Sequence, residues 1–121
     1  SNFTANNATA EGGAIGIEAS TVTINASNFY YNHAAKGGAM YVGGNGTTNY
    51  VYSSVFVGNN ATGGKLGSKS GGSIYGASSF NIENVTISNS FAAEKGGGIY
   101  FTNVDVNYKN LTFINNTAES R

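Results

Sequence analysis

The sequence contains no cysteine, no proline and no tryptophan among its 121 residues. The absence of cysteine excludes a disulfide framework, a Cys-x-x-Cys redox site and a cysteine-ligated metal. Charge is also scarce, because charged residues make up 10 % of the chain, against roughly 25 % in an ordinary globular domain. The net charge is zero and no basic run occurs, so the electrostatic footprint of a nucleic-acid-binding protein is missing. No apolar run approaches the length of a membrane span.

Glycine and asparagine are abundant, with 18 residues of each type. Hydrophobic residues make up 40 % of the chain, which together with the low charge argues against disorder. A chain of this length is the size of one domain and can bury a core. The composition therefore predicts a single folded domain rich in turns.

Four Gly-Gly pairs divide the sequence into similar segments, and they begin at Gly12, Gly37, Gly71 and Gly96. After an incomplete first piece, "SNFTANNATAE", the segments are 25, 34, 25 and 26 residues long. A period in this range is typical of a solenoid. Within a segment the local period is two, as in "GGAMYV", where Met40 and Val42 share one face. We therefore expect about three short strands in each segment and no helix.

These patterns predict an all-β fold, a parallel β-helix of about four to five coils with about 25 residues each, forming one domain over residues 1–121. Equivalent residues of successive coils would stack at roughly 4.8 Å, with the Gly-Gly pairs at tight corners. Stacked asparagine amides can bond to one another and to turn backbone. The expected columns are Ile15, Met40, Ile74 and Ile99; Phe3, Phe29, Phe56, Ile87 and Phe113; and Asn6, Asn32, Asn59, Ser90 and Asn116, where Ser90 interrupts an asparagine ladder.

The repeated tetrapeptides carry a resemblance to a known family. Gly-Gly-Ala-Ile at 12–15 and Gly-Gly-Ala-Met at 37–40 alternate with Phe-x-x-Asn tetrads at Phe3, Phe29, Phe56 and Phe113. This alternation resembles the polymorphic outer membrane protein repeat and covers essentially the whole chain. The resemblance implies a right-handed β-helix, a surface-exposed protein and an adhesive or structural role. The later segments depart from the pattern, with Gly-Gly-Ser-Ile, Gly-Gly-Gly-Ile and the tetrad Ile-Ser-Asn-Ser at 87–90.

Eight Asn-x-Ser/Thr sequences make N-linked glycosylation a candidate modification. Their occupancy would place the protein outside the cell or on its surface, with covalent glycans and no other cofactor. The alternative is that asparagine suits turns and threonine suits strands, so that the motif arises from the fold itself. The candidate sites are Asn2, Asn7, Asn25, Asn45, Asn60, Asn84, Asn110 and Asn115.

Two surfaces are candidates for ligand binding. Tyr41, Tyr75 and Tyr100 each follow an inward residue, so alternation predicts an outward column of aromatic rings. The second segment, at 34 residues, is longer than the others and contains an inserted loop at 63–70, with Lys65 and Lys69. Insertions in solenoids often lie on the binding side. The alternatives are ordinary packing along the tyrosine ladder and a tolerated surface insertion.

The sequence lacks the pattern of an enzyme. The six acids are scattered over different coil positions, and His33 is the single histidine, without a neighbouring acid or second ligand. No glycine-rich segment ends in the Lys-Ser/Thr of a phosphate loop. We therefore predict no catalytic residues, no cofactor and no metal site.

The sequence predicts a non-catalytic extracellular structural glycoprotein, a β-helical building block of a cell-surface layer, appendage or fibril. The alternative is an adhesin or passenger module that binds a host or glycan ligand through the tyrosine column or the 63–70 loop. Exposed strand edges at both ends of a solenoid are adhesive unless covered. We therefore expect a segment or repeating unit of a longer solenoid or fibre, with self-association by end-to-end stacking, no nucleic-acid partner and no membrane span.

Overall fold

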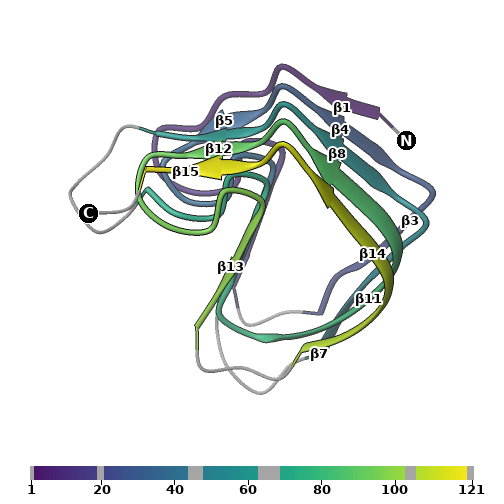
Figure 1. The fold of residues 1–121 in the computed structure, drawn as a ribbon. Coiled ribbons are helices and arrows are strands. Elements are labelled where there is room, and N and C mark those ends of the chain that lie inside the picture. The colour runs from purple at the N-terminus through teal and green to yellow at the C-terminus, as the bar shows by residue number, and fades with distance from the viewer. Residues whose placement is uncertain (1, 19–20, 44–47, 63–68, 103–105, 120–121) are drawn as a thin grey trace.

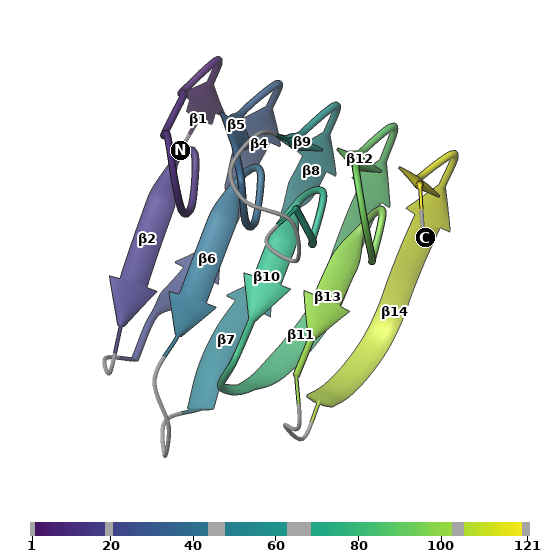
Figure 2. The ribbon, with the colours of Figure 1, turned by 90° about the vertical axis from the view of Figure 1, so that its left-hand side faces the viewer.

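The computed structural model describes residues 2–18, 21–43, 48–62, 69–102 and 106–119. Over these residues the chain contains fifteen strands and no helix, and thus no helix with the length and apolarity to cross a membrane. Every pair of neighbouring strands is parallel, and the coils follow one another along a single axis (Figures 1 and 2). The predicted all-β parallel β-helix is confirmed.

Each coil passes through three sheets. The largest sheet has the order β1-β4-β8-β11-β7-β3, with β14 also paired to β11, because β11 and β14 are long strands that run around a bend. Its strands are β1 (Asn2–Thr4), β3 (Thr23–Asn25), β4 (Asn28–Tyr30), β7 (Thr48–Tyr52), β8 (Val55–Val57), β11 (Ser79–Ser88) and β14 (Val106–Ile114). The second sheet contains β2 (Ile15–Glu18), β6 (Met40–Gly43), β10 (Ile74–Gly76) and β13 (Ile99–Phe101). The third contains β5 (His33–Ala34), β9 (Asn60–Ala61), β12 (Phe91–Ala92) and β15 (Thr117–Ala118).

The strand register places equivalent residues on top of one another. Ile74 pairs with Met40 on one side and with Ile99 on the other. In the phenylalanine column, the ring of Phe29 stacks on Phe3 at 4.7 Å and on Phe56 at 4.5 Å between centroids. These distances match the roughly 4.7–4.9 Å spacing between neighbouring strands. Both predicted apolar columns are confirmed.

The core lies inside the coils, where the inward side chains of all three sheets meet. Phe29, Phe56 and Ile74 have no exposed surface. Large side chains of one column fill the space left by a small residue in another. Gly76 has no side chain, and the rings of Phe80 and Phe101, 5.0 Å apart, occupy the space beside it. A Cβ atom on Gly76 would lie 2.5 Å from the Phe101 ring.

The Gly-Gly corners have two different steric causes. The first glycine of a pair adopts the left-handed conformation, as Gly37 does with φ of +62°. The second glycine lies against the next coil, since a Cβ on Gly38 would come within 2.2 Å of the Gly72 carbonyl oxygen. Glycine is therefore required at both positions of the tight corner, as the repeat predicted.

An asparagine ladder runs along another corner, and its members Asn32 and Asn59 are fully buried. Asn6 Nδ2 donates to Asn32 Oδ1 at 2.9 Å, and Asn32 Nδ2 donates to Asn59 Oδ1 at 3.0 Å. In the next coil Ser90 replaces asparagine, and Ser73 bridges the gap by accepting from Asn59 Nδ2 at 3.1 Å and bonding the Ser90 hydroxyl. The predicted ladder and its interruption are confirmed, and the bridging serine is a detail that the repeat did not predict.

Candidate functional site

Six of the eight candidate glycosylation asparagines are exposed in the structure. Asn60 is half-buried, and Asn45 lies outside the described residues. The exposed positions are Asn2, Asn7, Asn25, Asn84, Asn110 and Asn115. These six side chains are therefore accessible from solvent.

Local backbone geometry gives an independent reason for several of these asparagines. Asn84, Asn110 and Asn115 have positive φ angles of 56°, 54° and 52°. Asparagine tolerates this left-handed conformation better than most residues. Asn110 Nδ2 also donates to Asn84 Oδ1 at 2.9 Å, in an exposed ladder. The fold by itself therefore favours asparagine at these corners.

Asn60 has a more restricted environment than the other described sites. Its Oδ1 atom is buried and has no hydrogen-bond partner. Thr62, the third residue of the motif, bonds through Oγ1 to His33 Nε2 at 2.6 Å. His33 also contacts Asn7 Oδ1 through Nδ1 at 3.1 Å. His33 thus belongs to a side-chain ladder at this corner.

The predicted tyrosine column exists, but its rings differ in exposure. Tyr75 stacks on Tyr41 at 5.4 Å and contacts Tyr100 at 5.3 Å between ring centroids. Tyr75 and Tyr100 are half-buried, whereas Tyr41 is only 8 % exposed. The free aromatic surface is therefore smaller than three stacked outward rings would offer.

Charged groups surround this tyrosine column. Lys36 Nζ lies 5.2 Å from the centre of the Tyr75 ring, in a cation–π arrangement. The Tyr41 hydroxyl donates to Glu18 Oε2 at 3.5 Å. Burial, followed by the negative charges of Glu11 and Glu18, raises the pKa of Tyr41 from 10.0 to about 12. Burial also raises the pKa of Tyr75.

The predicted loop at 63–70 falls mostly outside the described residues, including Lys65. Lys69 is described and half-buried, and its carbonyl oxygen accepts a hydrogen bond from the Glu94 amide at 2.9 Å. The structure does not bring Lys69 together with the tyrosine column by any described contact.

The last described coil exposes the interior of the solenoid. Phe113 is 50 % exposed and Tyr108 is 71 % exposed, although both occupy columns whose other members face the core. An open volume of about 520 Å³ lies against this apolar end. Its lining residues are Ile99, Phe101, Val106, Tyr108, Leu111 and Phe113.

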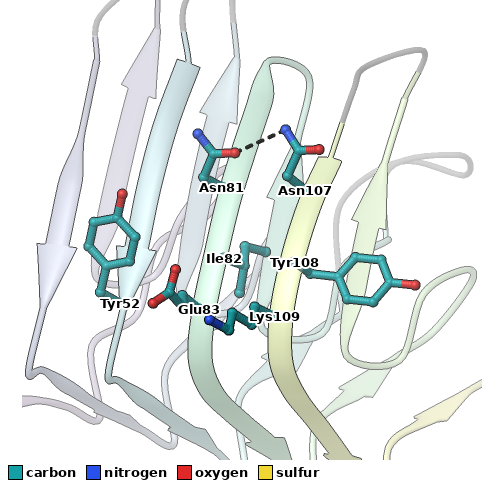
Figure 3. A pocket seen from close by; sticks show the side chains of 7 residues that line it. All are labelled: Tyr52, Asn81, Ile82, Glu83, Asn107, Tyr108 and Lys109. Carbon is teal, nitrogen blue, oxygen red and sulfur yellow. Dashed lines mark hydrogen bonds between the residues drawn. The ribbon is translucent and has the colours of Figure 1, made fainter.

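A second hollow of about 200 Å³ lies on the outer face of β7, β11 and β14 (Figure 3). We call this hollow the outer groove. Its lining residues are Tyr52, Asn81, Ile82, Glu83, Asn107, Tyr108 and Lys109. Asn107 Nδ2 donates to Asn81 Oδ1 at 3.1 Å at one end of the groove. Glu83 pairs in register with Tyr52 on one side and with Lys109 on the other.

Sequence reasoning missed the outer groove. The signal was present as period-two polar positions, such as Asn81 and Glu83 around the buried Ile82. The missing information was the space between outward side chains, because alternation gives the side of a strand on which a residue lies but not whether its neighbours enclose a hollow.

No group of three or more histidine, aspartate or glutamate side chains that could hold a metal occurs among the residues described. No family model, no curated protein and no solved structure matches this chain. The resemblance to the polymorphic outer membrane protein repeat therefore stays a prediction.

Proposed function

We propose that this protein is a non-catalytic, extracellular structural glycoprotein, a β-helical building block of a cell-surface layer, appendage or fibril, in which coils continue either within a longer solenoid or through copies stacked end to end. The observation that carries this proposal is the complementarity of the first and last described coils. Both ends present members of the same columns. In the asparagine ladder, the last coil offers a main-chain donor and the first coil offers a side-chain acceptor.

The apolar part of this complementarity comes from the repeat. Phe3 and Ile15 are half-buried at the first coil, and Phe113 and Ile99 belong to the same two columns at the last coil. Placing Phe3 of one copy on Phe113 of another would continue the ring stacking that already joins Phe3, Phe29 and Phe56. Such stacking would cover the exposed apolar end.

The asparagine ladder supplies a polar match with a defined direction. The backbone amide of Asn6 donates to Asn32 Oδ1, and the backbone amide of Asn32 donates to Asn59 Oδ1, each at 2.9 Å. At these two positions, and at Ser90, whose amide donates to Asn116 Oδ1 at 3.0 Å, the main-chain amide donates to the coil that follows. Continuing this pattern would pair the Asn116 amide of one copy with Asn6 Oδ1 of the next.

A head-to-tail contact of this kind joins two different surfaces. Because the contact does not close on itself, it generates open filaments and not closed dimers. Extracellular placement is supported by the exposed sequons.

The test is the assembly state of the 121-residue chain, measured by light scattering over a concentration series and by negative-stain electron microscopy. We expect rods one solenoid wide that lengthen with concentration. Phe113→Asp places a charge on the apolar end and is expected to abolish lengthening. Tyr31→Asp is the matched control, because Tyr31 is 65 % exposed and lies outside both end surfaces. A monodisperse monomer, or equal loss of assembly in the control, would overturn the proposal.

The second candidate function is an adhesin module that binds a host or glycan ligand. The observation that favours it is the partly exposed pair Tyr75 and Tyr100 beside the Lys36 ammonium. Tyr100→Ala should then reduce attachment of the protein to host cells or immobilised glycans. Unchanged attachment would reject the tyrosine column as the binding surface.

A further inference from the structure

The outer groove brings together several kinds of side chain that the sequence keeps apart. Tyr52 comes from β7, Asn81 and Glu83 from β11, and Asn107 and Lys109 from β14. These residues lie at outward positions, because the alternate positions Val51 and Ile82 are buried in the core. The parallel register therefore builds the groove on a rigid sheet.

The two tyrosines of the groove play different parts. Tyr108 pairs in register with the buried Ile82, and Figure 3 shows its side chain pointing away from the amide pair. The main chains at Ile82 and Tyr108 consequently form the floor. Tyr52 is half-buried and stands at one side of the groove, where its ring is an aromatic wall.

The remaining groups provide hydrogen bonds of both kinds. An asparagine side chain has both donor and acceptor atoms, a carboxylate accepts and an ammonium donates. Because only one bond joins Asn81 and Asn107, both amides retain further capacity. Glu83 and Lys109 are exposed neighbours that add an acceptor and a donor at the opposite end from the amide pair (Figure 3).

This combination of groups matches a neutral sugar. Sugar hydroxyls donate and accept at once, and the apolar face of a pyranose ring can pack on an aromatic wall. The groove charges cancel and are solvent-exposed, so solvent screens them and they give little preference for a charged ligand. A volume of about 200 Å³ is below the roughly 300–1,000 Å³ of a drug-sized pocket, which suits one ring of a chain that continues beyond the groove.

We propose that the outer groove is a carbohydrate-binding site that holds one neutral pyranose unit of an oligosaccharide, with Tyr52 stacking on the ring and Asn81, Glu83, Asn107 and Lys109 bonding its hydroxyls. The site is separate from the tyrosine column. Its β14 residues belong to the last coil, and Tyr108 also lines the apolar end, so the groove lies on the flank next to that end. A filament of this protein would display one such site per copy along its flank.

The test is isothermal titration calorimetry of the unglycosylated 121-residue chain with cellohexaose, mannohexaose, chitohexaose and maltohexaose. We expect saturable binding of at least one of these probes at one site per chain. Tyr52→Ala removes the stacking wall and Glu83→Gln removes the charged acceptor. Each should weaken that binding at least about tenfold, which for Glu83 is roughly the value of a hydrogen bond to a charged group. Glu83→Gln keeps the side-chain volume and guards against a folding defect in Tyr52→Ala.

Matched control variants are Tyr30→Ala and Glu119→Gln, which remove a half-buried tyrosine and an exposed carboxylate outside the groove. Binding in these variants should stay within about twofold of the parent chain. No saturable binding of any probe, or equal loss in the controls, would overturn the proposal. Running the titration in the Phe113→Asp background separates the result from filament assembly, because Phe113 does not line the groove.

Discussion

The side-chain oxygen of Asn59 accepts two hydrogen bonds from Asn32, one from the backbone amide at 2.9 Å and one from Nδ2 at 3.0 Å. Asn59 Nδ2 also donates to the carbonyl oxygen of Phe29 at 3.0 Å. Both asparagines have no exposed surface. The Asn59 side chain thus supplies hydrogen bonds to buried main-chain groups at a corner, where pairing between strands does not supply them.

Replacing Asn59 should destabilise the fold strongly. Asn59→Ala leaves the Asn32 amide and the Phe29 carbonyl buried without these partners. An unsatisfied buried group costs about 1–3 kcal/mol, so we expect a loss of roughly 2–5 kcal/mol in the free energy of unfolding. Urea denaturation monitored by circular dichroism measures this quantity. Asn107→Ala is the control at an exposed ladder position and should change stability by less than about 0.5 kcal/mol.

Two glycines should differ in how strongly the same added methyl group destabilises the fold. Gly38→Ala places a Cβ atom 2.2 Å from the Gly72 carbonyl oxygen and 2.4 Å from the Asn60 amide nitrogen. Because both neighbours are backbone atoms, the coils must separate, and we expect a loss of about 3 kcal/mol or more. At Gly16 the nearest atom to a Cβ is the Glu11 carbonyl oxygen at 3.4 Å. Gly16→Ala should stay within about 1 kcal/mol in thermal denaturation, and equal effects at both sites would contradict the close packing of the corner.

Alkaline pH should destabilise the protein through the tyrosine column. Because the pKa of Tyr41 is raised to about 12 when folded, the folded state keeps a proton that the unfolded chain loses near pH 10. The free energy of unfolding is therefore highest below pH 10 and falls between pH 10 and 12, by up to about 3 kcal/mol from this residue. Tyr75 contributes in the same direction. Denaturation curves across this range should show a smaller pH slope for Tyr41→Phe, and an unchanged slope would mean that Tyr41 does not titrate in this way.

Glycan occupancy should follow the exposure of each sequon. In material secreted from a eukaryotic host, glycopeptide mapping should find sugars at Asn84, Asn110 and other exposed positions, and the lowest occupancy among the described sites at Asn60. Thr86→Ala destroys the motif at Asn84 and should remove the mass of one glycan. Bare asparagines throughout would leave turn chemistry as the explanation of the motifs and would remove the support for a glycoprotein.

Sequence periodicity was sufficient for the coil architecture, as the phenylalanine column illustrates. Phe3, Phe29 and Phe56 recur with the coil period, and the structure stacks their rings. A solenoid makes this prediction tractable, because each coil contacts only its neighbours and equivalent positions must meet. The corner glycines followed for the same reason, since every coil needs a left-handed first glycine and a second glycine against the backbone of the next coil.

Contacts between unlike positions could not be predicted in this way. Ser73 bridges the ladder at Ser90 from a different corner, and the half-buried state of Asn60 depends on how neighbouring coils pack. The exposure of the tyrosine column also differed from ring to ring, with Tyr41 largely covered. Alternation predicts on which side of a strand a side chain lies, but not which other side chains cover it there.

The sequence by itself determined the parallel β-helix, its stacked columns and its glycine corners, because a short repeat must satisfy the same local geometry in every coil. Tertiary structure decided which outward residues share one surface. The outer groove exists because Tyr52, Glu83 and Lys109 are aligned across three strands whose register follows from coil stacking. That alignment is set by the summed packing of all inward side chains and backbone bonds, and no single segment of the sequence contains it.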